Sequence, residues 1–253
     1  MRTVALTNLM MNKMKVILNA ASSIDGRIAT WNGDTKISSD SDLHRVHKLR
    51  SEVDAILVGI TTVIKDDPLL TSRKIPGRGK KDQKYISKGN PVRIIVDSMA
   101  KIPLHSTIVR TAKKIETRIA VTENAPLKKL RKLQELGLKI LIIDNDPSDS
   151  GRVDLEKLFD CLERDGISKI LVEGGGEINW SLIKNNLFDE LIVTVAPLII
   201  GGKNAIGLVG GKGYKTVLES TKVKLFKIQK KNTDEIVLYY KNLSKVKTKV
   251  NKK

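Results

Sequence analysis

The chain has 253 residues and a formal net charge of +18. This length is enough for one large domain, or two small ones, around a hydrophobic core. The single cysteine, Cys161, excludes an intramolecular disulfide, and one cysteine with three histidines makes no convincing zinc site, so no metal is expected. No apolar run is long enough to cross a bilayer or to act as a signal peptide, which predicts a cytoplasmic protein without a membrane partner.

The positive charge is concentrated in two stretches. Residues 73–88 are strongly basic, and the end of the chain, Lys241 to Lys253, contains six lysines and no acidic residue. Such a charge attracts nucleic acids and anionic substrates. The sequence has only four tyrosines, three phenylalanines and two tryptophans, which leaves few platforms for stacking bases. A basic nucleic-acid-binding protein is therefore the alternative from another functional class, and nucleic acid is not the favoured partner.

Short β-branched runs alternate with helical patterns, which favours an α/β fold. The predicted strands are Lys15–Asn19, Ala55–Val58, Val92–Val96, Thr117–Val121, Lys139–Ile143, Lys169–Val172 and Leu191–Val195. The predicted helices are Asp40–Glu52, Thr62–Lys65, Leu127–Leu136, Leu155–Arg164 and Glu177–Asn185. Two further runs, Lys222–Gln229 and Glu235–Tyr240, flank a turn and predict an antiparallel hairpin. We expect a mixed, mostly parallel sheet with helices on both faces and this C-terminal hairpin at one edge.

The same patterns predict one domain, from residue 15 to residue 240. Residues 1–14 would form an N-terminal extension, and residues 241–253 a basic tail without fixed structure.

The predicted helix Asp40–Glu52 contains a cation in an unusual place. Ser38 or Ser39 is the expected N-cap. The expected buried stripe comprises Leu43, Val46, Leu49 and Val53. Arg50 projects toward this apolar side, where an unpaired guanidinium would be costly, so it should have an anionic partner. A structural ion pair with a carboxylate, an anionic ligand, or a side chain that reaches out to water would each meet this need.

A run of three glycines, Gly174 to Gly176, joins the predicted strand Lys169–Val172 to the helix that follows. Glycines allow the backbone to approach a ligand, and the amides at a helix start favour an anion, so this turn predicts a phosphate or pyrophosphate site. A tight connection without a ligand is the alternative. The run has neither the full Gly-x-Gly-x-x-Gly pattern of a Rossmann domain nor the Gly-Lys-Ser/Thr of a P-loop.

Several motifs, taken together and in this order, carry a family resemblance. They are Asn19 to Ala29, Ile37 to Ser39, Leu49-Arg50, Val58 to Val63, Asp66 to Arg73, Arg93 to Ser98 and Leu171 to Gly176. With them, the chain from about Lys15 to Tyr240 resembles the riboflavin-biosynthesis reductase family, most closely its stand-alone archaeal type.

The resemblance implies a homodimer with a fold similar to that of dihydrofolate reductase, and NADPH as hydride donor, with NADH as the alternative. The implied reaction reduces the ribosyl side chain of 2,5-diamino-6-ribosylamino-4(3H)-pyrimidinone 5′-phosphate to the ribityl form. The implied cofactor-binding residues are Thr62, Asp66, Ser98, Gly174, Gly175, Gly176 and Glu177. The implied substrate-binding residues are Lys36, Arg50, Leu70, Arg73 and Glu173.

Two points stay open at this level. The substrate could instead be the deaminated compound, 5-amino-6-(5-phosphoribosylamino)uracil, or a pterin such as dihydrofolate. The proton that accompanies the hydride could come from Glu173, His47 or bound water, so no catalytic residue is assigned. The chain lacks the His-x-Glu and Pro-Cys-x-x-Cys patterns of a zinc deaminase, which predicts a reductase that does not deaminate.

Overall fold

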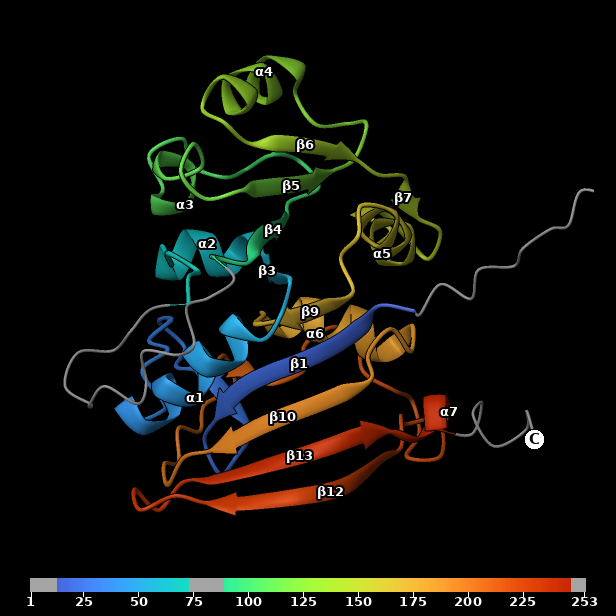
Figure 1. The fold of residues 1–253 in the computed structure, drawn as a ribbon. Coiled ribbons are helices and arrows are strands. Elements are labelled where there is room, and N and C mark those ends of the chain that lie inside the picture. The colour runs from blue at the N-terminus through green and yellow to red at the C-terminus, as the bar shows by residue number, and fades with distance from the viewer. Residues whose placement is uncertain (1–12, 73–88, 247–253) are drawn as a thin grey trace, which may run out of the picture.

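The computed structural model describes residues 13–72 and 89–246. Its main sheet comprises β1 (Lys15–Ser22), β3 (Ala55–Gly59), β4 (Val92–Val96), β5 (Thr117–Val121), β6 (Lys139–Ile142), β9 (Lys169–Val172), β10 (Glu190–Val195), β12 (Val223–Lys230) and β13 (Ile236–Asn242). The order across these nine strands is β12-β13-β10-β1-β9-β3-β4-β5-β6 (Figure 1). From β10 to β6 neighbouring strands are parallel, whereas β13 pairs antiparallel with β10 and β12 antiparallel with β13. The predicted mixed sheet and its C-terminal edge hairpin are confirmed.

The helices are α1 (Asp40–Ser51), α2 (Ile60–Asp66), α3 (Thr107–Arg110), α4 (Leu127–Glu135), α5 (Leu155–Arg164), α6 (Gly176–Lys184) and α7 (Leu243–Val246). Two small antiparallel sheets were not predicted. They pair β2 (Arg27–Ala29) with β11 (Ile206–Gly207), and β7 (Asn145–Asp146) with β8 (Asp149–Val153). These pairs are too short to show a period-two pattern in the sequence, and the same is true of the helical period in α3 and α7.

Side chains of the central strands alternate between two hydrophobic cores. In β3, Ile56 and Val58 pack into one core and Ala55 and Leu57 into the other, and all four are fully buried. Leu49 of α1 and residues of α2, α3 and α4 complete the first core, and α5 and α6 complete the second. Each fully buried aliphatic side chain contributes roughly 1.5–3 kcal/mol, so this two-sided packing fixes the strands whose ends form the site.

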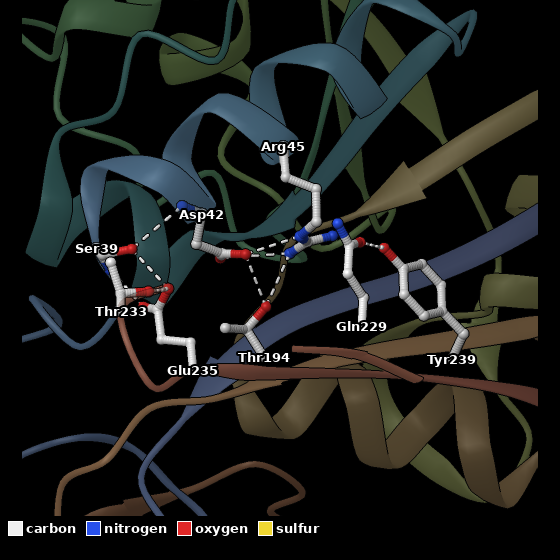
Figure 2. A network of polar contacts seen from close by, with 8 residues as sticks. All are labelled: Ser39, Asp42, Arg45, Thr194, Gln229, Thr233, Glu235 and Tyr239. Carbon is white, nitrogen blue, oxygen red and sulfur yellow. Dashed lines mark hydrogen bonds and ion pairs between the residues drawn. The ribbon is translucent and has the colours of Figure 1, made fainter. Parts of the chain in front are cut away.

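Helix α1 corrects one expectation. Leu43 is 46% exposed, although the helical pattern predicted it in the buried stripe, whereas Asp42 is 1% exposed. Asp42 faces the sheet because it forms an ion pair with Arg45, 2.7 Å, and accepts a hydrogen bond from Thr194 of β10, 2.8 Å (Figure 2). A polar network therefore replaces an apolar contact at this end of the helix.

The start of α1 is also tied to the C-terminal hairpin. Of the two predicted N-cap candidates, Ser39 is the N-cap, and its side chain accepts from the amide of Asp42. Its hydroxyl donates to Glu235, which is 2% exposed and also accepts from Thr233 (Figure 2). Helix α1 is thus held by β10 and by the hairpin turn that precedes β13.

Regular structure continues beyond residue 240, where the sequence predicted the domain to end. Strand β13 continues to Asn242, and α7 follows it, so the first residues of the predicted tail have regular structure. Within residues 13–72 and 89–246, no helix combines the length and apolar character that a membrane span requires.

Candidate functional site

A cavity of about 400 Å³ opens at the carboxyl ends of β1, β3 and β9. In parallel α/β sheets this is the edge at which ligands bind, because the strand ends and helix starts converge there. Its lining includes six of the seven predicted cofactor-binding residues, four in the loop and helix that follow β9 and two in α2. These are Gly174, Gly175, Gly176, Glu177, Thr62 and Asp66, and Glu173 of the predicted substrate set lies beside them.

The glycine turn between β9 and α6 forms one wall of this cavity. Gly174 and Gly175 have φ of +117° and +91°, a backbone region that residues with a Cβ rarely adopt. An ideal Cβ on Gly175 would lie 3.4 Å from the hydroxyl oxygen of Thr62. The first amides of α6 have no acceptor within the helix, and the residues that carry them line the cavity. The turn therefore offers the close backbone approach and the positive helix end that suit a diphosphate.

Glu177 has a different side-chain environment from the one expected of a ligand-binding group. Its carboxylate accepts hydrogen bonds from the amide of Gly211, 2.9 Å, and from Arg152, 3.2 Å. The amide of Gly210 donates to the carbonyl of Gly176, 2.9 Å. Glu177 thus fastens a second glycine-rich segment, residues 207–213, to the start of α6, and only its backbone amide is well suited to a diphosphate.

Asp66 lies at the end of α2 and lines the cavity beside Lys65. Burial raises the pKa of its carboxyl above the usual range, against a smaller lowering by the Thr35 hydroxyl, whose oxygen lies 3.4 Å away. A partly desolvated carboxylate of this kind suits hydrogen-bond donors of a ligand, such as amide or hydroxyl groups.

Arg50 and Glu173, both in the predicted substrate set, contact each other. The guanidinium donates from Nε and Nη2 to the two carboxylate oxygens, at 2.7 and 2.6 Å, and the side chains are 14% and 10% exposed. Burial alone would lower the pKa of Arg50, but the carboxylate of Glu173 outweighs it and raises that pKa above the ordinary value. Nη1 also donates to the carbonyl of Thr71, 3.2 Å. Of the partners considered for Arg50, the structure has the ion pair with a carboxylate.

Four predicted residues within the described ranges are not part of the cavity lining: Arg50, Leu70, Lys36 and Ser98. Leu70 is buried, 2% exposed, and its backbone has a positive φ of +48°. Lys36 is exposed on the loop before α1. Ser98 follows β4, where its hydroxyl accepts from the amide of Val153, 3.1 Å. Arg73 lies outside the described residues.

Sequence reasoning missed several residues of the site. Asn19 lines the cavity and is 8% exposed, and its side-chain oxygen has no hydrogen-bond partner in the described part of the chain. Asn179, Ile206 and Gly210 also line it. The clustered glycines at 207–213 were a signal for the second loop, whereas Asn19 lies inside strand β1 and was quoted in a motif of the resemblance without a role.

Comparisons with known proteins agree with this geometry. The family model for the RibD C-terminal domain matches residues 14–237. The 2,5-diamino-6-ribosylamino-4(3H)-pyrimidinone 5′-phosphate reductase of Methanothermobacter thermautotrophicus is 38% identical, over 88% of this chain and 96% of that protein. A protein of the same name from Aquifex aeolicus is 35% identical, over 81% of this chain and 86% of its own length.

Among solved structures, RibD of Acinetobacter baumannii has a TM-score of 0.74 and 24% identity, and the match covers 91% of this chain and 58% of that one. That likeness confirms the predicted fold, the one similar to dihydrofolate reductase. With the family model spanning the sheet, the glycine turn and the Arg50–Glu173 pair, the chain belongs to the RibD C-terminal domain family.

Proposed function

We propose that this chain is an oxidoreductase of riboflavin biosynthesis that uses NADPH to reduce the ribosyl side chain of 2,5-diamino-6-ribosylamino-4(3H)-pyrimidinone 5′-phosphate to the ribityl form. The observation that carries the proposal is the cavity at the β9–α6 turn, in a chain that aligns with almost the full length of a relative named for this activity. The deaminated uracil is the second candidate substrate.

A dinucleotide fits the residues present. The turn is shaped by two positive-φ glycines, and a Cβ at Gly175 would approach Thr62 closely. Backbone amides at the start of α6 would hold the diphosphate, and Thr62 and Asp66 would contact the remainder of the dinucleotide. When bound, NADPH supplies the hydride, which adds to C1′ of the ring-opened imine while the imine nitrogen gains a proton.

The substrate would lie on the side of the cavity formed by Glu173. Arg50 keeps one further hydrogen on each of Nη1 and Nη2 beyond the bonds described, so it can donate to an anionic or carbonyl group without leaving Glu173. The pair would hold the substrate in a fixed orientation, and positioning of two reacting carbons is the main contribution such a site makes. The reductase activity needs no nucleophile from the protein.

The test is a paired assay of the purified protein. NADPH absorbance is followed with the diaminopyrimidinone and with the deaminated uracil as substrates, and each is repeated with NADH. We expect the highest kcat/KM for the diaminopyrimidinone with NADPH. Faster turnover of the uracil would make that compound the assigned substrate, and no turnover of either compound would reject the proposed function.

We also infer a cytoplasmic homodimer, and we assign the contact to the hairpin β12–β13. Leu225, Phe226 and Ile228 on this edge strand are 41%, 44% and 60% exposed, a run of apolar side chains that pairing of two copies would cover. A monomeric mass in light scattering would contradict the dimer. A salt-dependent nucleic-acid complex that survives deletion of residues 241–253 would favour the nucleic-acid alternative instead.

A further inference from the structure

The segment Asp66–Thr71, which leads out of α2, has an unusual backbone. Asp67 and Leu70 both have positive φ, +39° and +48°, although neither is glycine. Such conformations are strained, especially for a bulky side chain, and persist only where the surroundings determine them strongly. The segment is adjacent to the site at both ends, because Asp66 lines the cavity and the carbonyl of Thr71 accepts from Arg50.

One anchor of this segment lies in α3. The carboxylate of Asp67 accepts from the backbone amide of Thr107, 2.6 Å, and from its hydroxyl, 2.7 Å. These bonds, led by the one from the hydroxyl, lower the pKa of Asp67, so the carboxylate stays charged at neutral pH. The segment is thereby tied to the first residue of a helix on the neighbouring part of the sheet.

The second anchor is Arg93 of β4, which is fully buried, 0% exposed. Its guanidinium donates to the carbonyl of Leu69, 3.2 Å, and to the hydroxyl of Thr111, 2.8 Å. Its other acceptors are the hydroxyl of Thr117 and the carbonyls of Ile108 and Ile115. Within the described part of the chain these acceptors include no carboxylate. Burying a cation without an anionic partner costs free energy, so the position of Arg93 suggests that its fixed hydrogen bonds serve a function.

The two anchors form one connected system. The hydroxyl of Thr111, which accepts from Arg93, itself donates to the carbonyl of Thr107, 2.7 Å, and Thr107 holds Asp67. At the far end of the segment, the carbonyl of Thr71 accepts from Arg50 and lies 3.1 Å from Nδ1 of His47. The segment is therefore held through the side chain of Asp67 and through the carbonyls of Leu69 and Thr71, on both sides of the strained Leu70.

We propose that Arg93 and the Asp67–Thr107 pair are positioning residues of the reductase. They hold the segment in its strained conformation and thereby place Asp66 at the cavity and Leu70 and Thr71 beside Arg50. The inference rests on the proposed function, because it assigns a purpose to the position of groups that would bind dinucleotide and substrate. None of the three residues lines the cavity.

The test uses matched substitutions in the full-length protein. Thr107→Val removes the hydroxyl and keeps the shape, whereas Thr107→Ser keeps the hydroxyl. Asp67→Asn weakens the same contact, and its control is Asp234→Asn, because Asp234 is exposed and also has a positive φ, +60°. Arg93→Lys keeps the charge but reaches fewer acceptors. The readouts are the Kd for NADPH from fluorescence titration, KM and kcat for the pyrimidine, and the melting temperature.

We expect Thr107→Val, Asp67→Asn and Arg93→Lys to raise Kd and KM about tenfold, with a smaller change in kcat, because misplaced binding groups act at a distance from the reacting atoms. Thr107→Ser should have values of Kd and KM close to those of the wild type, and Asp234→Asn should not change them. If Arg93→Lys fails to fold, the Thr107 pair decides the question.

Variants that melt earlier but keep wild-type Kd and KM would overturn the inference, since the anchors would then be structural only. Thr107→Ser behaving like Thr107→Val would also overturn it. These outcomes leave an active wild-type enzyme, and so they differ from failure of the proposed function, in which the wild type itself neither binds NADPH nor reduces either pyrimidine. That last result would reject both.

Discussion

The side chain of Arg50 makes two different contacts at the site. It closes an ion pair with Glu173 at the end of β9, and it holds the carbonyl of Thr71. A planar fork with several donors can do both at once, which a lysine ammonium cannot.

Truncation of this side chain should therefore affect substrate use. For Arg50→Ala we expect kcat/KM to fall roughly thirtyfold, which corresponds to a loss of about 2 kcal/mol in transition-state stabilisation. The reason is that charged hydrogen bonds are lost beside the cavity. The matched control is Arg118→Ala, since Arg118 is similarly buried and pairs with Asp165, 2.6 Å, but lies near the amino end of β5, the opposite edge of the sheet. Steady-state kinetics of both variants checks this, and an equal loss in the two would contradict a specific role for Arg50.

Asp25 predicts a pH dependence of stability. Its carboxylate accepts from the Ser23 hydroxyl, 2.6 Å, and from the amides of Ile200 and Gly201, and these bonds, led by the one from Ser23, lower its pKa to about 2. Because the folded pKa lies below the unfolded value of about 3.9, the contribution is fully present above that value and is lost as the pH falls toward 2.

The measurement is urea unfolding of the wild type and of Asp25→Asn between pH 7 and pH 2. We expect the wild type to be the more stable at neutral pH and its advantage to shrink steadily below pH 4. An advantage that is unchanged at the acid end of this range would show that the hydrogen bonds do not depend on the charge.

At the scale of elements, α1 depends on a buried polar contact with β10 in addition to the apolar packing of Leu49. Asp42 is 1% exposed and Arg45 is its ion-pair partner. For Asp42→Ala we expect a loss of about 3–5 kcal/mol in the free energy of unfolding, because Arg45 would stay buried without its partner. Asp40→Ala is the control, since Asp40 is exposed in the same first turn, and it should cost no more than about 1 kcal/mol. Equal effects in urea unfolding would refute the buried-pair explanation.

At the β9–α6 turn, two glycine substitutions can distinguish the effect of backbone strain from an effect on dinucleotide binding. Gly175 and Gly166 both have positive φ, +91° and +84°, but an added Cβ would approach Thr62 only at Gly175, and at Gly166 it meets open space. Both Gly175→Val and Gly166→Val should lower the melting temperature, because each introduces roughly 1–3 kcal/mol of backbone strain. Only Gly175→Val should raise the Kd for NADPH, by at least about tenfold. An unchanged Kd in Gly175→Val would remove the turn from the dinucleotide site.

The elements themselves were largely predictable from local patterns. All seven predicted strands exist, as do the hairpin and the Ser39 cap, because buried parallel strands and capped helices leave continuous signals in the sequence. The stripe of α1 was wrong at Leu43, because the tertiary partner Thr194 makes Asp42 the inward residue. A helical period cannot reveal a partner that lies about 150 residues away.

At the scale of the whole molecule, the site depends on strand order. Strand β1 lies between β10 and β9, so the ends of an early strand and of late strands meet at one edge (Figure 1). The cavity is lined by residues from four separate stretches, 19–35, 59–66, 173–179 and 206–210. The resemblance assigned binding roles only to residues of the second and third of these stretches. Asn19 stands in a motif of the resemblance and Gly210 among clustered glycines, but neither was given a role, because their place in the site follows from strand order.

The central claim is that the amides at the start of α6 hold the diphosphate of a nicotinamide dinucleotide. A crystal structure of the protein with bound NADPH tests it most directly. We predict both phosphates within hydrogen-bond distance of the backbone at residues 174–177, with the nicotinamide ring directed toward the Arg50–Glu173 pair. A dinucleotide bound at another edge of the sheet, or a turn that stays closed by protein side chains at saturating NADPH, would contradict the account.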